Sequence, residues 1–234
     1  MKNKRVIIIM IIIIVLILAV ISGIFMYNKF QQQELKQLTE EANKLLQQDI
    51  INDEIDNEIK TSKNYAIVEK AVKEYITDLK NIYLEIEELN TKISIDTIFS
   101  EENFSDNKLE NIDKVVDEYN QKGKEYLEKI KKLEQEENII NSLNLDNISN
   151  KKDYYIDLYK TIILSDSMKN QYKKIEEKIE KSNDKLHNNL IVISNAKKYL
   201  EKNTKSWEIK EGKLIFKNPN IMIEYYNIIN QLKK

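Results

Sequence analysis

The chain of 234 residues contains no cysteine, one proline and three glycines. Without cysteine it has no disulfide, no thiolate nucleophile and no site for a lipid anchor attached to an N-terminal cysteine, which suits an exported bacterial protein that does not use disulfides. With so few turn-forming residues, many short strands joined by tight loops are not expected, and long helices are the default. The composition therefore predicts a mainly α-helical protein.

Arginine and histidine are nearly absent, since Arg5 and His187 are the only ones. Nucleic-acid binding needs a clustered basic face, preferably with arginine, whereas the chain after residue 27 has more acidic than basic residues, so no nucleic-acid partner is expected. His187 has no second histidine and no cysteine for a catalytic triad or a zinc site, and we interpret it as a solvated helix residue. We expect no enzyme, no cofactor and no metal site.

One long apolar run opens the chain, because residues 6–26 carry no charge. A helix rises about 1.5 Å per residue, so this run spans roughly 30 Å, the thickness of the hydrocarbon core of a bilayer. Lys2, Lys4 and Arg5 precede it, and this basic flank is expected to stay in the cytoplasm. We predict a cytoplasmic tail at 1–5 and an uncleaved signal anchor at 6–27.

This anchor would make the protein single-pass, bound to the lipid bilayer of the cell membrane through residues 6–27, with its C-terminal domain extracytoplasmic. A cleaved signal peptide is the alternative, although its apolar core usually measures only about 7 to 15 residues.

Residues 28–62 are predicted to continue the membrane helix as a helical stalk. Within it Leu35, Leu38, Ala42 and Leu45 have the spacing of a short coiled-coil seam. A sustained coiled coil usually needs at least three heptads, so the seam is suggestive only. Leu35, Leu38 and Leu45 are therefore candidate residues of an interaction surface for a protein partner or a second copy of the chain.

Residues 63–234 are predicted to form an elongated, up-down antiparallel helical bundle that resembles a coiled coil. Apolar residues recur every 3.5 residues on average between 68 and 93, between 109 and 140, and between 154 and 193. Gly123 lies on the second stripe, where we expect two helices to approach closely. Two alternatives stay open: the third helix, from 153, runs unbroken to about 203 or restarts at Ser182, and the fourth bundle partner is the stalk, the last helix or another chain.

A small β-hairpin is predicted at 206–217, around Glu211-Gly212. A two-residue turn would place four apolar side chains on one face, whereas a three-residue turn would mix the two faces, so the first register has the better pattern. These side chains are Trp207, Ile209, Leu214 and Phe216. The apolar face must rest on the helices, because an isolated hairpin is marginal in water. A last helix, 219–232, is expected to follow the capping residue Asn218.

Thirteen tyrosines occur in the chain, and those on the apolar stripes are expected to pack in the core. Tyr154, Tyr155 and Tyr159 cluster at the start of a predicted helix and are the first candidates for a ligand surface. The most specific function that follows is a non-enzymatic protein-interaction or structural module at the bacterial cell surface. The alternative is a ligand-binding or sensing module for a cell-wall fragment or a small molecule.

Overall fold

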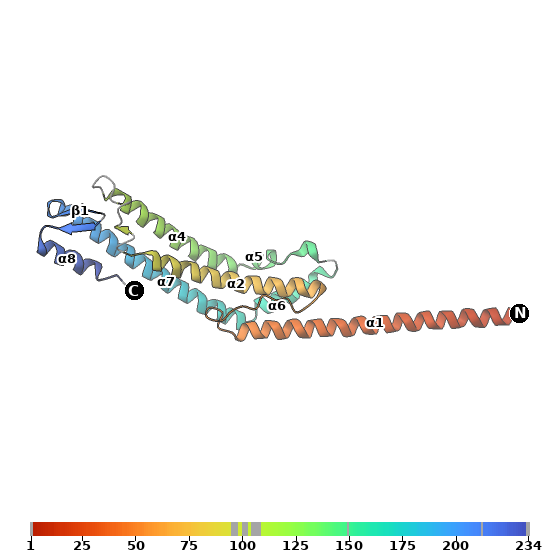
Figure 1. Ribbon diagram of the computed structural model, residues 1–234. Helices are drawn as coiled ribbons and strands as arrows, with labels where there is room; N and C mark the ends of the chain where they lie inside the picture. Colours follow the sequence, from red (N-terminus) through yellow and green to blue (C-terminus); the bar gives the residue numbers. More distant parts are fainter. Residues whose placement is uncertain are drawn as a thin grey trace. The chain divides into compact units, whose positions relative to one another are not determined.

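The computed structural model describes the backbone of residues 2–94, 98–99, 103, 109–148, 150–211 and 213–232, and their side chains except those of 2–15, 17 and 110 (Figure 1). In chain order the described elements are α1 (Lys2–Gln47), α2 (Lys63–Lys92), α4 (Glu110–Glu134), α5 (Glu136–Asn141), the 3-10 turn η2 (Leu145–Asn147), α6 (Lys152–Ile163), α7 (Asp166–Lys202), the 3-10 turn η3 (Thr204–Ser206), β1 (Trp207–Lys210), β2 (Lys213–Phe216) and α8 (Pro219–Ile229). This confirms the prediction of a mainly helical chain with one hairpin near its end.

The chain divides into two compact units. Unit 1 consists of residues 1–74 and 142–164, and unit 2 consists of residues 75–141 and 165–234. The division falls inside α2, after Glu74, and does not coincide with the predicted boundary between stalk and bundle after residue 62.

α1 is one uninterrupted helix from Lys2 to Gln47. Across the part of the chain whose side chains are described, no helix has both the length and the apolarity needed to cross a membrane. Residues 6–15 and 17 of the predicted span 6–27 have side chains outside that part. The transmembrane helix is therefore not supported by the structure, and it stays a prediction.

The helical stalk was predicted to reach residue 62, and this is wrong for its second half, because α1 ends at Gln47. The Asp49 carboxylate accepts hydrogen bonds from the backbone amides of Ile51 at 3.1 Å and Asn52 at 3.4 Å, and the Asp49 amide donates to the Asp53 carboxylate at 2.9 Å. Such local side-chain bonds compete with the helical ladder. Residues 48–62 consequently run as a non-helical segment in unit 1.

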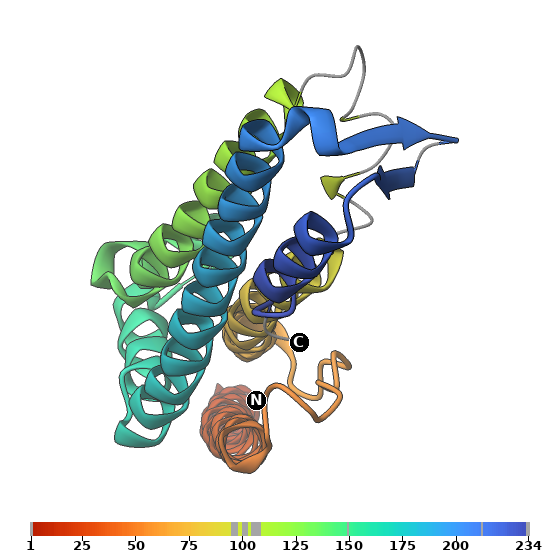
Figure 2. The same ribbon diagram turned by 90° about the vertical axis from the view of Figure 1, so that its left-hand side faces the viewer.

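In unit 2 the helices form an up-down arrangement, as the stripes predict. The Tyr172 hydroxyl of α7 donates to the Ile130 carbonyl of α4 at 2.9 Å, while Lys197 pairs with Asp113 at 2.6 Å. Residue numbers rise along α7 as they fall along α4, so the two helices are antiparallel neighbours, and they lie side by side in Figures 1 and 2.

Gly123 marks a close approach of α4 to α7. A Cβ atom at this position would lie 2.5 Å from Asn183 Oδ1 and 2.9 Å from Leu186 Cδ2. Real Cβ atoms do not approach other atoms this closely, so a larger residue at Gly123 needs a shift of these side chains. The predicted close approach of two helices at Gly123 is confirmed.

The predicted third helix is divided in two at a position that differs from both alternatives, an unbroken helix and a restart at Ser182. α6 ends at Ile163, and α7 starts after Ser165, whose hydroxyl caps it by accepting from the Met168 amide at 3.2 Å. α7 then passes through Ser182 without a break, because Ser182 is buried there: its carbonyl accepts from Asn90 Nδ2 at 2.9 Å.

The hairpin has the two-residue register, with Trp207 opposite Phe216 and Ile209 opposite Leu214. Glu211 adopts a positive φ of 53°, as a tight turn requires, whereas Gly212 lies outside the described residues.

The apolar face of the hairpin rests on the helices of unit 2, as predicted. The Trp207 indole is buried and donates to the Leu200 carbonyl at 2.7 Å. The side chain of Asn218 caps α8, which ends at Ile229 and not at 232, and Tyr225 joins the core of unit 2 beside α7. The last helix is thus one further partner of the bundle.

Candidate functional site

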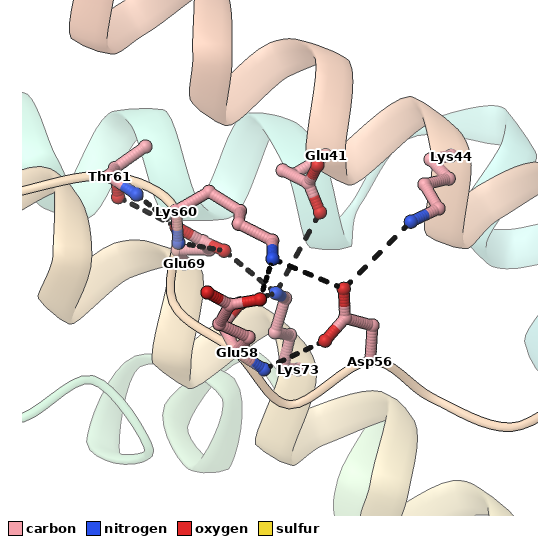
Figure 3. Close-up of polar contacts among 8 residues, drawn as sticks. All are labelled: Glu41, Lys44, Asp56, Glu58, Lys60, Thr61, Glu69 and Lys73. Carbon is pink, nitrogen blue, oxygen red and sulfur yellow. Dashed lines mark hydrogen bonds and ion pairs between the residues drawn. The ribbon is translucent and has the colours of Figure 1, made fainter.

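A group of charged side chains lies among α1, α2 and the segment 48–62 of unit 1 (Figure 3). We call it the charge cluster, and its members are the charged residues Glu41, Lys44, Asp56, Glu58, Lys60, Glu69 and Lys73 together with the polar residue Thr61. Two of these ionisable side chains are buried, since Glu69 is 1% exposed and Lys73 is 2% exposed. Lys73 Nζ and Glu69 Oε1 lie 2.7 Å apart, so the centre of the cluster is a buried ion pair.

Local sequence places this pair on one face of α2. Glu69 precedes Lys73 by four residues, which brings the two side chains together on a helix in the favourable order. Val68 and Val72, next to them in the sequence, are at most 1% exposed. The same turns of α2 therefore carry both apolar and charged side chains into the interior of unit 1.

The Glu69 carboxylate binds the segment 48–62 through three hydrogen-bond donors of that segment. It accepts hydrogen bonds from the Lys60 amide at 3.0 and 3.1 Å, from the Thr61 amide at 2.8 Å and from the Thr61 hydroxyl at 2.8 Å. Burial acts to raise the pKa of Glu69, but the hydrogen bonds from Lys73, Lys60 and Thr61 outweigh it, so its pKa is lowered. Glu69 is an ionised carboxylate inside the unit.

Lys73 connects α2 to the other two elements of the cluster. Its ammonium group donates to the Glu58 carbonyl at 2.6 Å and lies 3.8 Å from the Glu41 carboxylate of α1. A buried ammonium group lowers the stability of the fold unless its N–H groups donate hydrogen bonds. Here carboxylates and a carbonyl accept these bonds. The pair Glu69–Lys73 thus clamps α1, α2 and the segment 48–62 together.

The outer part of the cluster consists of Asp56, Glu58 and Lys60 of the segment 48–62 and Lys44 of α1. Asp56 lies 3.6 Å from Lys60 and 4.0 Å from Lys44, and Glu58 pairs with Lys60. The pKa of the Asp56 carboxyl is lowered mainly by the hydrogen bond that the Glu58 amide donates to it. Lysines and a backbone amide pair with these carboxylates, which adds further contacts between the segment 48–62 and α1.

The candidate interaction residues of the seam lie in unit 1. Leu38 and Leu45 are 1% and 3% exposed, and Leu35 is half-buried. The seam face of α1 is thus covered by its own chain, and contact of Leu38 or Leu45 with a second molecule would require unit 1 to open. Their part in an interaction surface stays a prediction.

The three candidate tyrosines differ in exposure. Tyr154 is 41% exposed, whereas Tyr155 and Tyr159 are buried. Tyr154 and Tyr155 lie edge to face with Tyr65, at centroid distances of 6.5 and 5.2 Å, while the Tyr159 hydroxyl lies 2.6 Å from Ser142 Oγ. Only Tyr154 of the three is exposed, and their role as a ligand surface stays a prediction.

Tyr65 is the residue of this aromatic group that the sequence analysis missed. Its hydroxyl donates to Gln31 Oε1 at 3.1 Å and lies 3.2 Å from the Tyr154 hydroxyl, which joins α1, α2 and α6. Burial and the bond to Tyr154 raise the pKa of Tyr65. The position three residues before Val68 extends the first apolar stripe, and this spacing could have identified it.

His187, the last residue singled out for its chemistry, is exposed on α7, with Nδ1 3.4 Å from Asn120 Oδ1. Its interpretation as a solvated helix residue is confirmed. Comparison of the chain with models of known families, with curated proteins and with solved structures found no match.

Proposed function

We propose that the protein is a non-enzymatic interaction or structural module, anchored in a bacterial cell membrane by residues 6–27 with its folded part extracytoplasmic. The observation that carries this proposal is the uncharged run 6–26 within a single continuous helix. The described apolar side chains at the end of this run are more than half exposed, namely Leu16, Leu18, Val20, Ile21, Ile24, Phe25 and Met26. Successive helix positions differ by about 100°, so these residues surround the helix, a pattern typical of a membrane span.

The orientation follows from charge. Lys2, Lys4 and Arg5 form the cytoplasmic flank of the anchor in this proposal. Because the chain has no cysteine, a single introduced cysteine reports the side of the membrane on which it lies. We expect Lys205→Cys to react with a membrane-impermeant maleimide in intact cells, and Asn3→Cys to react only after lysis. Reaction of both, or labelling of Asn3→Cys alone in intact cells, would contradict the topology.

Anchoring has its own test, which does not depend on topology. Deletion of residues 6–27 is expected to move the protein from the carbonate-resistant membrane fraction to the soluble fraction. Retention of the deleted protein in that membrane fraction would contradict an anchor at these residues.

An exposed apolar face on α8 supports the interaction role. Met222, Ile223 and Tyr226 lie on one side of the helix and are 37%, 54% and 48% exposed. Groups of exposed apolar side chains often mark contact surfaces. We therefore favour this face over the buried Leu38 of α1 as the contact surface.

The contact test uses single cysteines in native membranes. Ile223→Cys should form an intermolecular crosslink with a second copy or another membrane-associated protein, whereas Leu38→Cys should not. Absence of any crosslinked species at Ile223 would contradict an interaction through α8.

A further inference from the structure

Three segments of unit 1 meet next to the end of the apolar run. Tyr65, near the start of α2, donates to Gln31 of α1 and contacts Tyr154, near the start of α6. The Asn64 side chain donates to the Asn150 carbonyl at 3.3 Å, immediately before α6. The starts of α2 and α6 therefore lie beside α1 about one helical turn after Tyr27.

Lysines from these segments lie over aromatic rings of α1. Lys63 Nζ is 4.6 Å from the centroid of the Phe30 ring, and Lys151 Nζ is 5.8 Å from the centroid of the Tyr27 ring. Both lysines are exposed, and both adopt a positive φ of 52°, which is uncommon for a residue with a Cβ atom. Two further exposed lysines are sequence neighbours of these residues: Lys29 precedes Phe30, and Lys152 follows Lys151. We call this group the lysine–aromatic surface: Tyr27, Phe30, Lys29, Lys63, Lys151 and Lys152.

Acidic groups are fewer here. Glu34 accepts a hydrogen bond from the Ser62 amide at 2.6 Å, and Asp153 lies in the first turn of α6. Within the segments 27–34, 62–65 and 150–154, four lysines against two carboxylates leave a net positive charge. The starts of α2 and α6 add the positive ends of two helix dipoles.

The proposed anchor determines the position of this surface relative to the bilayer. If residues 6–26 span the hydrocarbon core, Tyr27 lies at the level of the lipid headgroups, where tyrosine and lysine are commonly found. Since Lys63 and Lys151 contact the rings of Phe30 and Tyr27, they lie at the same level. Phosphate groups of anionic lipids attract lysines at this depth.

We propose that unit 1 rests on the outer surface of the bilayer through the lysine–aromatic surface and binds the headgroups of anionic phospholipids. This inference rests on the proposed membrane anchor and extends it: α1 inserts, while the starts of α2 and α6 contact the surface. The two contacts together hold unit 1 against the membrane. With the single contact of α1 alone, unit 1 could rotate freely relative to the bilayer.

The experiment measures the depth of single labels in the full-length chain reconstituted into vesicles. A fluorophore on Asn150→Cys reports the lysine–aromatic surface, and one on Ser22→Cys reports the anchor. A third, on Gln47→Cys, reports the far end of α1, about 30 Å along the helix from Tyr27. A quencher is attached to the lipid headgroups. We expect quenching at position 150 in phosphatidylglycerol vesicles, weaker quenching there in phosphatidylcholine vesicles, and none at position 47.

Two lysine variants test the headgroup contact directly. Lys63→Gln with Lys151→Gln should reduce the docked-to-undocked ratio about fivefold for each lysine removed. The matched variant Lys36→Gln with Lys70→Gln removes two exposed lysines of unit 1 outside the surface and should leave the quenching unchanged. Circular dichroism and thermal unfolding of both variants verify that unit 1 stays folded.

The outcomes separate the two proposals. If the label at position 22 is not in lipid, the anchor itself is wrong. If position 22 is in lipid but position 150 is not quenched, the anchor stands and the surface contact is overturned. Equal quenching at position 150 in both lipids, unchanged by loss of Lys63 and Lys151, would also overturn the binding of anionic headgroups.

Discussion

The interior of unit 1 contains the ion pair Glu69–Lys73, whereas the core of unit 2 is a cluster of apolar side chains from its helices and hairpin. Unit 2 also has a buried lysine, Lys197, but its carboxylate partners Asp113 and Glu201 are 60% and 47% exposed. Water therefore reaches the partners in unit 2, while both partners in unit 1 are enclosed. Unit 1 therefore encloses a complete ion pair among its buried apolar side chains, whereas the buried lysine of unit 2 has partners in contact with water.

Loss of one charge from the enclosed pair should have the largest effect. Lys73→Met leaves Glu69 buried without its ammonium partner, and we expect it to lower the free energy of unfolding of unit 1 by about 3–5 kcal/mol. Hydrogen exchange on the full chain in detergent measures each unit separately.

The matched control is Lys70→Met, one turn away on α2, whose pair with Glu74 is exposed and whose loss should cost less than about 1 kcal/mol. The double variant Glu69→Leu/Lys73→Met should recover only part of the loss, because it also removes the acceptor of the Lys60 and Thr61 amides. Equal effects at Lys70 and Lys73 would show that enclosure of the pair has no energetic consequence.

A truncation in the apolar core should destabilise unit 2 by a similar or slightly smaller amount. Ile193 is 0% exposed, and Ile193→Ala should cost about 2–5 kcal/mol through lost burial and the cavity left behind. Ile191→Ala, at a position 45% exposed on the same helix, should cost less than about 0.5 kcal/mol. Hydrogen exchange should show lost protection in unit 2 with unit 1 retained. If both units lose protection together, they unfold as one cooperative body.

Gly123→Ala should have a smaller effect on stability, because two contributions to the free energy of unfolding oppose each other. The new Cβ crowds Asn183 and Leu186, which costs about 1–3 kcal/mol, while alanine improves helix propensity by about 1 kcal/mol. We expect a net destabilisation of unit 2, measured by chemical unfolding. Lys124→Ala, exposed on the next position of α4, gains no such clash and should be nearly neutral. A stabilised Gly123→Ala variant would show that the approach of α4 to α7 is easily widened.

Acidification should have the smallest effect, and the Glu69 carboxyl of unit 1 and the Glu176 carboxyl of unit 2 should contribute to it in opposite directions. The pKa of Glu69 is lowered in the folded chain, so its contribution is present above the usual glutamate value of 4.5 and is lost as the pH falls through the folded pKa. In unit 2, burial and the nearby Glu134 and Glu180 raise the pKa of Glu176, so its protonation favours the folded state as the pH falls toward 4.5.

The measurement is hydrogen exchange of the full chain from pH 7 to pH 3, corrected for the intrinsic exchange rate. Protection should fall in unit 1 relative to unit 2. Glu176→Gln should remove the contribution of that carboxyl in unit 2. A larger loss of protection in unit 2 than in unit 1 would contradict the contrast.

Several parts of the fold could be predicted from the sequence because they depend on neighbours along the chain. The heptad spacing identifies the helices, and the alternation around Glu211 selects the hairpin register with Trp207 and Ile209 on the buried face. Gly123 could be interpreted because it interrupts a stripe of larger residues. Asn218 caps α8 for a local reason as well.

The charge cluster could not be predicted in this way. Glutamate–lysine pairs four residues apart occur at Lys70–Glu74 and at Glu69–Lys73, and nothing in their spacing separates the exposed pair from the buried one. The difference arises from the Lys60 and Thr61 amides, which reach Glu69 from another segment.

The sequence by itself determined that the chain is helical, where its apolar stripes lie and how its hairpin turns, since these follow from periodicity and from the φ preferences of single residues. Only the tertiary structure decided that α7 continues through Ser182 and that Glu69 and Lys73 are enclosed. Each of these depends on whether a polar group finds its partner on a distant segment, and the free energy of that pairing is invisible to any local pattern.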